Sequence, residues 1–410
     1  MNDDPTVLLA PQGQELLARL AAEGPSRGST SLALAERLRR EYPAALVATA
    51  MAQWELRQAA AAKFSRAADM LFTRAGYEQS SSETIASYRA GRLQRAARIA
   101  DLCCGIGGDL IALAEASEVL AVDRDETHAI LALHNAAVYG RADHVRTATD
   151  DVRDVSLAGM DAVFIDPARR SGPGSASAAD ARRYKAGTSE PPLDWCAALT
   201  DAVPAVCIKA APGIPADLIP QGWEAEFIAE SRDLKEAVLW SPALATAPAA
   251  AARGRRRATV ITQAKAGGAQ TSHTLVAREG GQVPLREPGE YLLDPNPAVT
   301  RAGLVEDLAR TLGGDAAKID PQIAFLTLDR DARTPFARTL RVVHSAPWNE
   351  KQFARRLREL GIGAVDIRRR GLAGDVDQMR RRLKLSGKAR ATVVITRVEN
   401  KPWGLICADA

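Results

Sequence analysis

From residue 97 to residue 263 the sequence alternates between short β-forming runs and stretches with helical spacing. Strands are predicted at 97–104, 118–123 and 205–210, with a weak strand at 144–150 and a strong one at 161–166. Helices are predicted at 108–116 and 127–140, the second ending at Gly140. Three more strand-like runs follow, at 224–231, 236–242 and 257–263. Such alternation predicts an α/β fold with a doubly wound, mostly parallel sheet, and the closely spaced last strands favour an antiparallel edge.

The segments on either side of this alternation have a different pattern. Residues 1–95 read as a helical region, with apolar residues at helical spacing in 16–20, 32–38 and 44–72. Ser80 and Glu83 have capping-box spacing, and a helix through Ile85, Tyr88 and Arg92 is expected to follow. The sequence therefore predicts three parts, at 1–95, 96–265 and 266–410.

The third part is predicted to be a small α+β domain with a basic exterior. Its two helical segments have apolar stripes, Phe353, Leu357 and Leu360 in one and Val376, Met379 and Leu383 in the other, and the arginines lie off them. Residues 338–397 contain 13 Arg and 3 Lys against 2 Glu and 3 Asp, a net charge of +11. The whole chain carries only +4, so the remainder carries −7. A polyanionic partner is the favoured interpretation, and solvated helix faces are the alternative.

Two segments read as mobile loops. Residues 170–186 are rich in Gly, Ser and Ala and end near Arg182, Arg183 and Lys185. Residues 248–257 form a Pro/Ala run that ends in three arginines. The first loop directly follows the strong strand at 161–166.

Composition excludes several classes of protein. A hydrophobic content of 46% with 25% charged residues is typical of a globular chain and rules out a disordered or collagen-like one. The N-terminus lacks the order of a signal peptide, and no run approaches 18 apolar residues. The five cysteines form no CxxC, and the five histidines show no ligand spacing. These features predict a cytoplasmic location and no metal.

The strongest motif is the glycine-rich turn DLCCGIGGD at 101–109, where a strand meets a helix. Glycines there let the backbone approach a ligand, and the helix N-terminus offers free N–H groups. The dinucleotide-binding pattern requires a third glycine at position 110, which is Leu110. No G-K-[ST] follows, so the pattern is not a P-loop either.

Acidic residues follow the first three strands of the predicted sheet. Asp101 precedes the first glycine of the turn by four residues and can pair with a ligand ammonium. Asp123 ends the second strand and is placed to accept both hydroxyls of a ribose. Asp150 or Asp151 follows the third strand, where a carboxylate can accept the amino group of adenine. An ammonium, a ribose and an adenine together describe S-adenosylmethionine.

The chain resembles the class I S-adenosylmethionine-dependent methyltransferases, and more closely the bacterial ones with a THUMP-like C-terminal domain. The motifs that carry the resemblance are DLCCGIGGD (101–109), AVDRDE (121–126) and FIDPARR (164–170). Supporting segments lie at 78–92, 291–299 and 368–388. The resemblance implies a seven-stranded Rossmann-like methyltransferase sheet, a helical N-terminal region and an RNA-associated C-terminal module.

Asp166 and Pro167 end the fourth strand, where methyltransferases of base amino groups often have [DNS]-P-P-[FYW]. An acid there accepts hydrogen bonds from the amine and directs its lone pair at the methyl group, so orientation does most of the catalytic work. Ala168 and Arg169 depart from that pattern, although a guanidinium can stack on a base or grip a phosphate. Asp166 also has a simpler interpretation, as a cap of the following turn.

The Asp-Pro-x-Arg order also resembles RNA C5-pyrimidine methyltransferases, which use a cysteine after the fifth strand. Cys207 lies mid-strand, and the positions where that cysteine would sit read Lys209-Ala210-Ala211-Pro212. Cys207 is therefore interpreted as a buried core thiol. The Cys103-Cys104 pair is interpreted as packing, with the Cys103 backbone near the cofactor.

These arguments assign candidate residues to each role. The cofactor is assigned to Asp101, Cys103, Gly105, Gly107, Asp109, Asp123 and Asp151, with Ser81 and Arg89 as possible lining. Catalysis is assigned to Asp166 and Pro167, and substrate binding to Arg169, Arg368, Arg369, Arg370 and Arg381, with Arg380 and Arg382 beside it. The predicted function is methylation of an RNA base. Two alternatives stay open, a catalytically degenerate RNA-binding protein and a methyltransferase for a small molecule or protein.

Overall fold

The computed structural model describes residues 4–24, 28–169, 189–249, 254–263, 270–372 and 374–409. The chain divides into two compact units, residues 1–220 with 239–245 and residues 221–238 with 246–410. The predicted boundaries at 95 and 265 stay predictions. Among the described residues, no helix is both long and apolar enough to cross a membrane.

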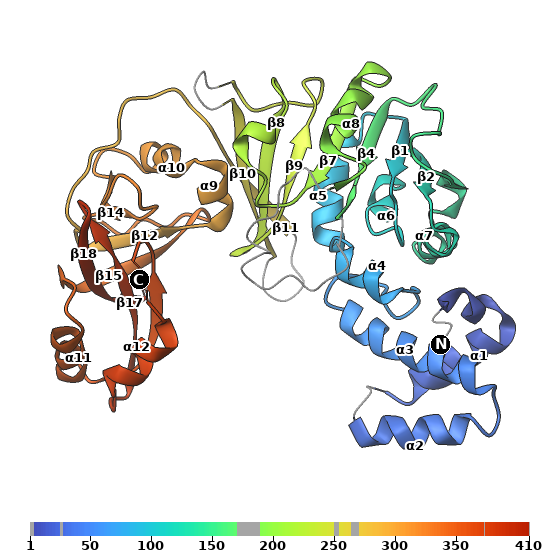
Figure 1. Ribbon diagram of the computed structural model, residues 1–410, viewed down its shortest axis with the longest axis horizontal. Helices are drawn as coiled ribbons and strands as arrows, with labels where there is room; N and C mark the ends of the chain where they lie inside the picture. The colour runs from blue at the N-terminus through green and yellow to red at the C-terminus, as the bar shows by residue number, and fades with distance from the viewer. Residues whose placement is uncertain are drawn as a thin grey trace. The chain divides into compact units, whose positions relative to one another are not determined.

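Helices dominate the N-terminal region, as predicted (Figure 1). They are η1 (Pro5–Leu9), α1 (Pro11–Ala22), α2 (Gly28–Leu38), α3 (Ala44–Ala60), α4 (Arg74–Gln79) and α5 (Glu83–Leu93). The apolar faces of η1 and α1–α3 form one core that also includes Ile106 of the glycine turn, Ile111 of α6 (Leu110–Leu113) and Leu131 of α7 (Glu126–Val138). The Asn135 side chain adds hydrogen bonds to Leu71 N–H (2.9 Å) and to the Ile106 carbonyl (2.8 Å). The helical region is thereby fixed to the glycine turn.

Two local predictions in this region are wrong. The helix expected over 44–72 ends at Ala60, because the segment from Met70 to Phe72 is fully buried and not helical, held by hydrogen bonds with Gln53 and Asn135. The N-cap of α5 is Ser82, whose Oγ accepts from Ile85 N–H at 3.4 Å, rather than Ser80. Glu83 instead accepts a hydrogen bond from Ser65 N–H at 2.7 Å. The expected helix itself is present as α5.

The α/β alternation forms a large, mostly parallel sheet in the order β11-β10-β8-β9-β7-β4-β1-β2-β3. Its strands are β1 (Arg98–Leu102), β2 (Glu118–Asp123), β3 (Val145–Thr149), β4 (Ala162–Ile165), β7 (Ala205–Ala210), β8 (Glu224–Glu230), β9 (Asp233–Trp240), β10 (Arg255–Gln263) and β11 (Gln270–Val276). The associated helices are α6 (Leu110–Leu113), α7 (Glu126–Val138) and α8 (Leu193–Ala198). The predicted fold class is confirmed.

This sheet has nine strands in the described part of the chain, against the seven implied by the resemblance. The extra strands are β10, which pairs in parallel with β8, and β11, which pairs antiparallel with β10. The antiparallel edge is thus formed by β11, a strand that the sequence analysis did not predict. The helix predicted at 108–116 is shorter, because α6 is confined to Leu110–Leu113. Of the two predicted loops, 170–186 lies outside the described residues, and residues 255–257 belong to β10 instead of a loop.

The register of the parallel strands places several candidate residues in one row. Leu102 pairs with Val122 on one side and with Ile165 on the other, and Ile165 pairs with Ile208. The next positions along these strands are Cys103, Asp123, Asp166 and Lys209. Ligands bind at this carboxyl edge in doubly wound sheets.

In the described residues of the C-terminal part, seven strands form a sheet in the order β13-β14-β12-β15-β18-β17-β16. Its elements are β12 (Tyr291–Pro295), α9 (Pro297–Ala302), α10 (Val305–Leu312), β13 (Ala317–Lys318), β14 (Leu326–Leu328), β15 (Ala337–Pro347), α11 (Glu350–Glu359), β16 (Ile362–Arg369), α12 (Val376–Leu383), β17 (Ala389–Val398) and β18 (Lys401–Asp409). The predicted stripes of α11 and α12 pack in one core, through Phe353, Leu357 and Leu383. A second core contains Ile319, Ile323 and Phe325 with Leu340 and Val394 of the sheet.

Candidate active site

The glycine turn after β1 has a backbone that ordinary side chains disfavour. Cys103, Gly105 and Gly107 have φ angles of 61°, 53° and 85°. A Cβ on Gly107 would lie 3.0 Å from Ala132 Cα in α7, so this position requires glycine for packing as well as for conformation. A Cβ on Gly105 would meet nothing within 4 Å. The turn is therefore packed at Gly107 and open at Gly105.

The Asp123 carboxylate holds this turn. One oxygen accepts from Gly105 N–H (2.8 Å), and the other accepts from Asp125 N–H (3.0 Å). His128 Nδ1, in the first turn of α7, lies 3.6 Å from the carboxylate. Burial raises the pKa of Asp123, but the bonds from His128, Asp125 and Gly105 lower it more, and the net pKa is below its usual range. The bond to Asp123 in turn raises the pKa of His128. The oxygen that accepts from Gly105 N–H keeps a second lone pair for a ribose hydroxyl, whereas the other oxygen faces both Asp125 N–H and His128.

Asp101 is a fully buried carboxyl group whose two oxygens have no hydrogen-bond partner among the described residues. Burial raises its pKa well above the usual range, and the negative charges of Asp109, Asp166 and Asp123 raise it further. A buried group without a partner requires an explanation. A ligand ammonium beside Asp101 would provide both a donor and a countercharge, so the residues present fit the amino-acid end of S-adenosylmethionine.

Asp109 lies against the buried guanidinium of Arg89 in α5. Arg89 Nη2 forms an ion pair with Asp109 and donates to Ser81 Oγ at 2.7 Å. Burial raises the pKa of Asp109, but Arg89 and Lys209 outweigh it, so that the pKa is lowered. Phe164 of β4 lies below the guanidinium, 5.5 Å from its carbon to the ring centroid. Asp109, Ser81 and Arg89 thus link α5 to the glycine turn.

Asp166 extends the row from Cys103 and forms an ion pair with Lys209 of β7. Its backbone N–H donates to the Leu102 carbonyl at 3.2 Å. Pro167 is buried, and the next two residues form β5 (Ala168–Arg169), which pairs antiparallel with β6 (Ser189–Glu190). Lys209 was missed as a site residue by the sequence analysis. Its signal was a single charge inside the otherwise apolar strand AVCIKA.

Asp151 follows β3 and is partly exposed. It accepts from Arg153 N–H at 3.0 Å and pairs with the Arg153 guanidinium at 3.1 Å. Asp150 N–H donates to the Asp123 carbonyl at 3.2 Å, which fixes this loop beside the end of β2. Both acids therefore follow the strand at the edge where Asp123 lies.

The cysteines of the first unit do not form a reactive set. Cys207 is fully buried in β7, as expected for a core thiol, and Cys104 is also buried. Burial raises the pKa of Cys103, and the negative charges of Asp123 and Asp166 raise it further. Among the described residues, no cluster of three or more His, Cys, Asp or Glu side chains is arranged to hold a metal ion.

The candidate arginines of the second unit lie on two elements. Arg368 and Arg369 end β16 and Arg370 follows it, whereas Arg381 is exposed on α12. The backbone of Arg169 is placed in β5, by its pairing with Ser189.

Comparisons with known proteins agree with this geometry. Two uncharacterized S-adenosylmethionine-dependent methyltransferases of Mycobacterium tuberculosis, from strains CDC 1551 and H37Rv, are each 33% identical over 341 residues, which is 80% of this chain and 85% of the relative. The chain belongs to the S-adenosylmethionine-dependent methyltransferases. A crystal structure described as a methyltransferase from Porphyromonas gingivalis W83 matches this methyltransferase in fold, with a TM-score of 0.72 at 20% identity, over 97% of this chain and 98% of the other.

Family models match three separate segments of this methyltransferase. Residues 96–179 match the RNA cap guanine-N2 methyltransferase family, and residues 337–409 match the THUMP domain-like family. Residues 3–60 match a domain of unknown function. The predicted methyltransferase activity and the THUMP-like C-terminal domain are confirmed.

Proposed function

We propose that this methyltransferase transfers a methyl group to a nitrogen of an RNA base. The observation that carries the proposal is the position of Asp166, which directly follows β4 and lies in one row with Cys103 and Asp123. The similarity of residues 96–179 and 337–409 to RNA-related families supports RNA as the substrate class. The basic charge of residues 338–397 supports it as well.

The cofactor-binding roles rest on the site described above. Asp101 is expected to accept from the ammonium of S-adenosylmethionine, Asp123 from the ribose hydroxyls and Asp151 from the adenine amino group. Gly105, with open space where a side chain would be, lets the backbone approach the ligand. When bound, the cofactor supplies an electrophilic methyl group on its sulfonium.

Asp166 acts on the acceptor. Its carboxylate accepts an N–H of the exocyclic amine and turns the nitrogen lone pair toward the methyl group. Lys209 contributes the countercharge to this carboxylate and fixes its direction. Pro167 is buried beside Asp166 and limits the freedom of the backbone at that point.

The test compares modified nucleosides, by mass spectrometry, in RNA from cells with and without the protein. One methylated nucleoside is expected to disappear, and purified protein with S-adenosylmethionine is expected to restore it. Asp166→Asn should abolish the restoration, and Asp143→Asn, an exposed residue away from this row, is the matched control. Unchanged nucleosides together with no methyl transfer to RNA in vitro would refute the proposal.

Two alternatives give different results in the same assays. A catalytically degenerate RNA-binding protein would give no calorimetric signal with S-adenosylmethionine. A methyltransferase for a small molecule or protein would keep its turnover when RNA is absent. The cytoplasmic location stays a prediction, to be checked by cell fractionation.

A further inference from the structure

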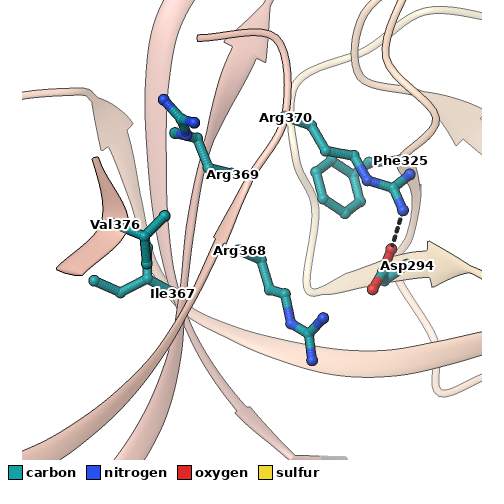
Figure 2. A pocket seen from close by; sticks show the side chains of 7 residues that line it. All are labelled: Asp294, Phe325, Ile367, Arg368, Arg369, Arg370 and Val376. Carbon is teal, nitrogen blue, oxygen red and sulfur yellow. Dashed lines mark ion pairs between the residues drawn. The ribbon is translucent and has the colours of Figure 1, made fainter. Parts of the chain in front are cut away.

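The second unit contains a cavity of about 330 Å³ beside the end of β16 (Figure 2). Three consecutive arginines, Arg368, Arg369 and Arg370, line it together with Asp294 of β12 and Phe325. Nothing in the methyl-transfer site accounts for this cavity.

Asp294 organises one wall of the cavity. Its buried carboxylate pairs with Arg232 Nη2 at 2.8 Å and with Arg370 Nη2 at 3.0 Å. The Arg370 guanidinium lies 4.9 Å from the centroid of the Phe325 ring, which fixes its plane. One carboxylate therefore faces two guanidinium groups whose positions are already set.

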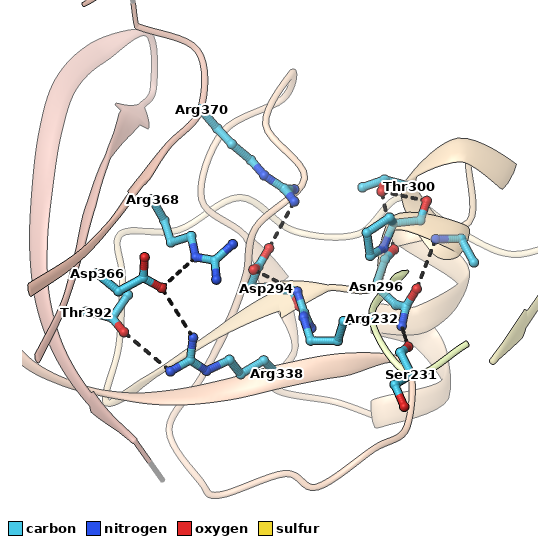
Figure 3. A network of polar contacts seen from close by, with 12 residues as sticks. Ser231, Arg232, Asp294, Asn296, Thr300, Arg338, Asp366, Arg368, Arg370 and Thr392 are labelled. Carbon is cyan, nitrogen blue, oxygen red and sulfur yellow. Dashed lines mark hydrogen bonds and ion pairs between the residues drawn. The ribbon is translucent and has the colours of Figure 1, made fainter. Parts of the chain in front are cut away.

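The cavity carries more positive than negative charge. Its lining residues include three arginines and one aspartate. Asp366 accepts from Arg368 Nε at 2.9 Å and also pairs with Arg338 (Figure 3). With Arg232, Arg338 and Asp366 included, the excess is three positive charges. Arg369 Nη1 is buried and has no hydrogen-bond partner among the described residues. The positive charge of the lining residues is therefore not balanced by carboxylates, and a bound anion would balance it.

A second observation shows that these guanidinium groups are close enough to repel each other. Burial lowers the pKa of Arg232, and Arg368, Arg338 and Arg370 lower it further, against the opposite effect of Asp294. An anion that enters the cavity would relieve this repulsion and gain charge-assisted hydrogen bonds from forked donors.

We infer that this cavity binds the terminal phosphomonoester of an RNA strand, an inference that rests on the proposed RNA substrate. A phosphomonoester carries a charge of about −1.5 to −2 at neutral pH and offsets most of this excess. An internal phosphodiester carries one charge and offsets less of it. Ile367 and Val376 form an apolar side of the same cavity, next to which the terminal nucleoside can lie.

The experiment measures binding of the full-length protein to fluorescently labelled RNAs of one sequence that differ only at their ends. Strands with a 5′-phosphate, a 3′-phosphate or hydroxyls at both ends are compared by anisotropy. A phosphorylated end is expected to bind roughly 10-fold more tightly than the hydroxyl form. Arg368→Gln is expected to remove this preference, and Arg355→Gln, an exposed charge on α11, to retain it. Thermal unfolding of both variants verifies that they fold.

Three results would overturn the inference. Equal affinity for all three ends, with methyl transfer to RNA intact, refutes the phosphate pocket and leaves the proposed function standing. Competition by inorganic phosphate at the same concentration as the phosphorylated RNA identifies a site for small anions instead. Absence of both RNA binding and RNA methylation overturns the proposed function and this inference together.

Discussion

The Lys209 ammonium of β7 is paired with the carboxylate of Asp166, one position beyond the register pair Ile165–Ile208. The side chain of Lys209 is 12% exposed and that of Asp166 is 33% exposed, so the lysine is the more buried partner. In the proposed function, Lys209 lies on the acceptor side of the site.

Replacing Lys209 by Met is expected to lower kcat by roughly 100-fold, because the carboxylate that orients the acceptor loses its fixed countercharge. The Kd of S-adenosylmethionine should change little, and Lys209→Arg should restore part of the rate. Single-turnover methylation and calorimetry measure the two quantities. An equal loss of cofactor affinity would show that Lys209 acts through the cofactor instead.

Asp101→Asn is expected to weaken S-adenosylmethionine binding by roughly 10-fold to 100-fold, since a charge-assisted hydrogen bond contributes about 1.5–3 kcal/mol. The ammonium of the ligand loses its carboxylate partner, and the fold keeps a side chain of the same shape. Isothermal calorimetry of the wild type and variant measures this loss. The position of Asp101 would have no bearing on the cofactor if the two affinities were the same.

Asp101 also gives the stability of the ligand-free protein a pH dependence. Its pKa in the folded state is raised above that of the unfolded chain. Between the two pKa values, the folded state therefore holds one more proton at Asp101 than the unfolded state. The contribution of this proton to the free energy of unfolding is fully present below the unfolded pKa. It is lost as the pH rises from the unfolded pKa through the raised pKa of the folded state. Asp101→Asn should unfold at a higher temperature than the wild type at neutral pH, with the difference shrinking in acid.

Gly107→Ala and Gly105→Ala form a matched pair. Both place a side chain at positive φ, but only the Cβ at residue 107 meets backbone, 3.0 Å from Ala132 Cα. Gly107→Ala is expected to lower the free energy of unfolding by about 2–4 kcal/mol, and Gly105→Ala by about 1 kcal/mol. Urea unfolding measures both, and equal losses would contradict the packing argument.

Arg89→Met is expected to cost about 3–5 kcal/mol of folding free energy, because it leaves the carboxylate of Asp109 buried without its countercharge. The double variant Arg89→Met/Asp109→Asn should recover much of the loss. Chemical unfolding of the wild type, Arg89→Met, Asp109→Asn and the double variant completes the double-mutant cycle. Additive losses would show that the two side chains do not depend on each other.

Much of the parallel sheet could be predicted, because its strands are short apolar runs that end in acids or glycines. The turn at Gly105 and Gly107 and the strand ends at Asp123 and Asp166 lie where the sequence places them. Lys209 could not be assigned, since its pairing with Asp166 depends on which strands become neighbours, across 43 residues of sequence. Periodicity within one segment contains no information on that pairing.

The role of Asp109 and the end of α3 depend on tertiary contacts as well. Asp109 has the same sequence context as a ligand-binding acid, and only the fold brings the Arg89 guanidinium to it. The sequence after Ala60 keeps helix-forming residues, but burial of Phe72 in a non-helical segment outweighs that preference.

Asp123 has one structural task and one proposed task. Its carboxylate accepts from Gly105 N–H and so holds the backbone of the glycine turn, and the same carboxylate is the proposed ribose contact. A substitution of Asp123 therefore changes the ribose contact and the support of the glycine turn together. A related enzyme with a different residue at this position would need another hydrogen-bond acceptor for Gly105 N–H.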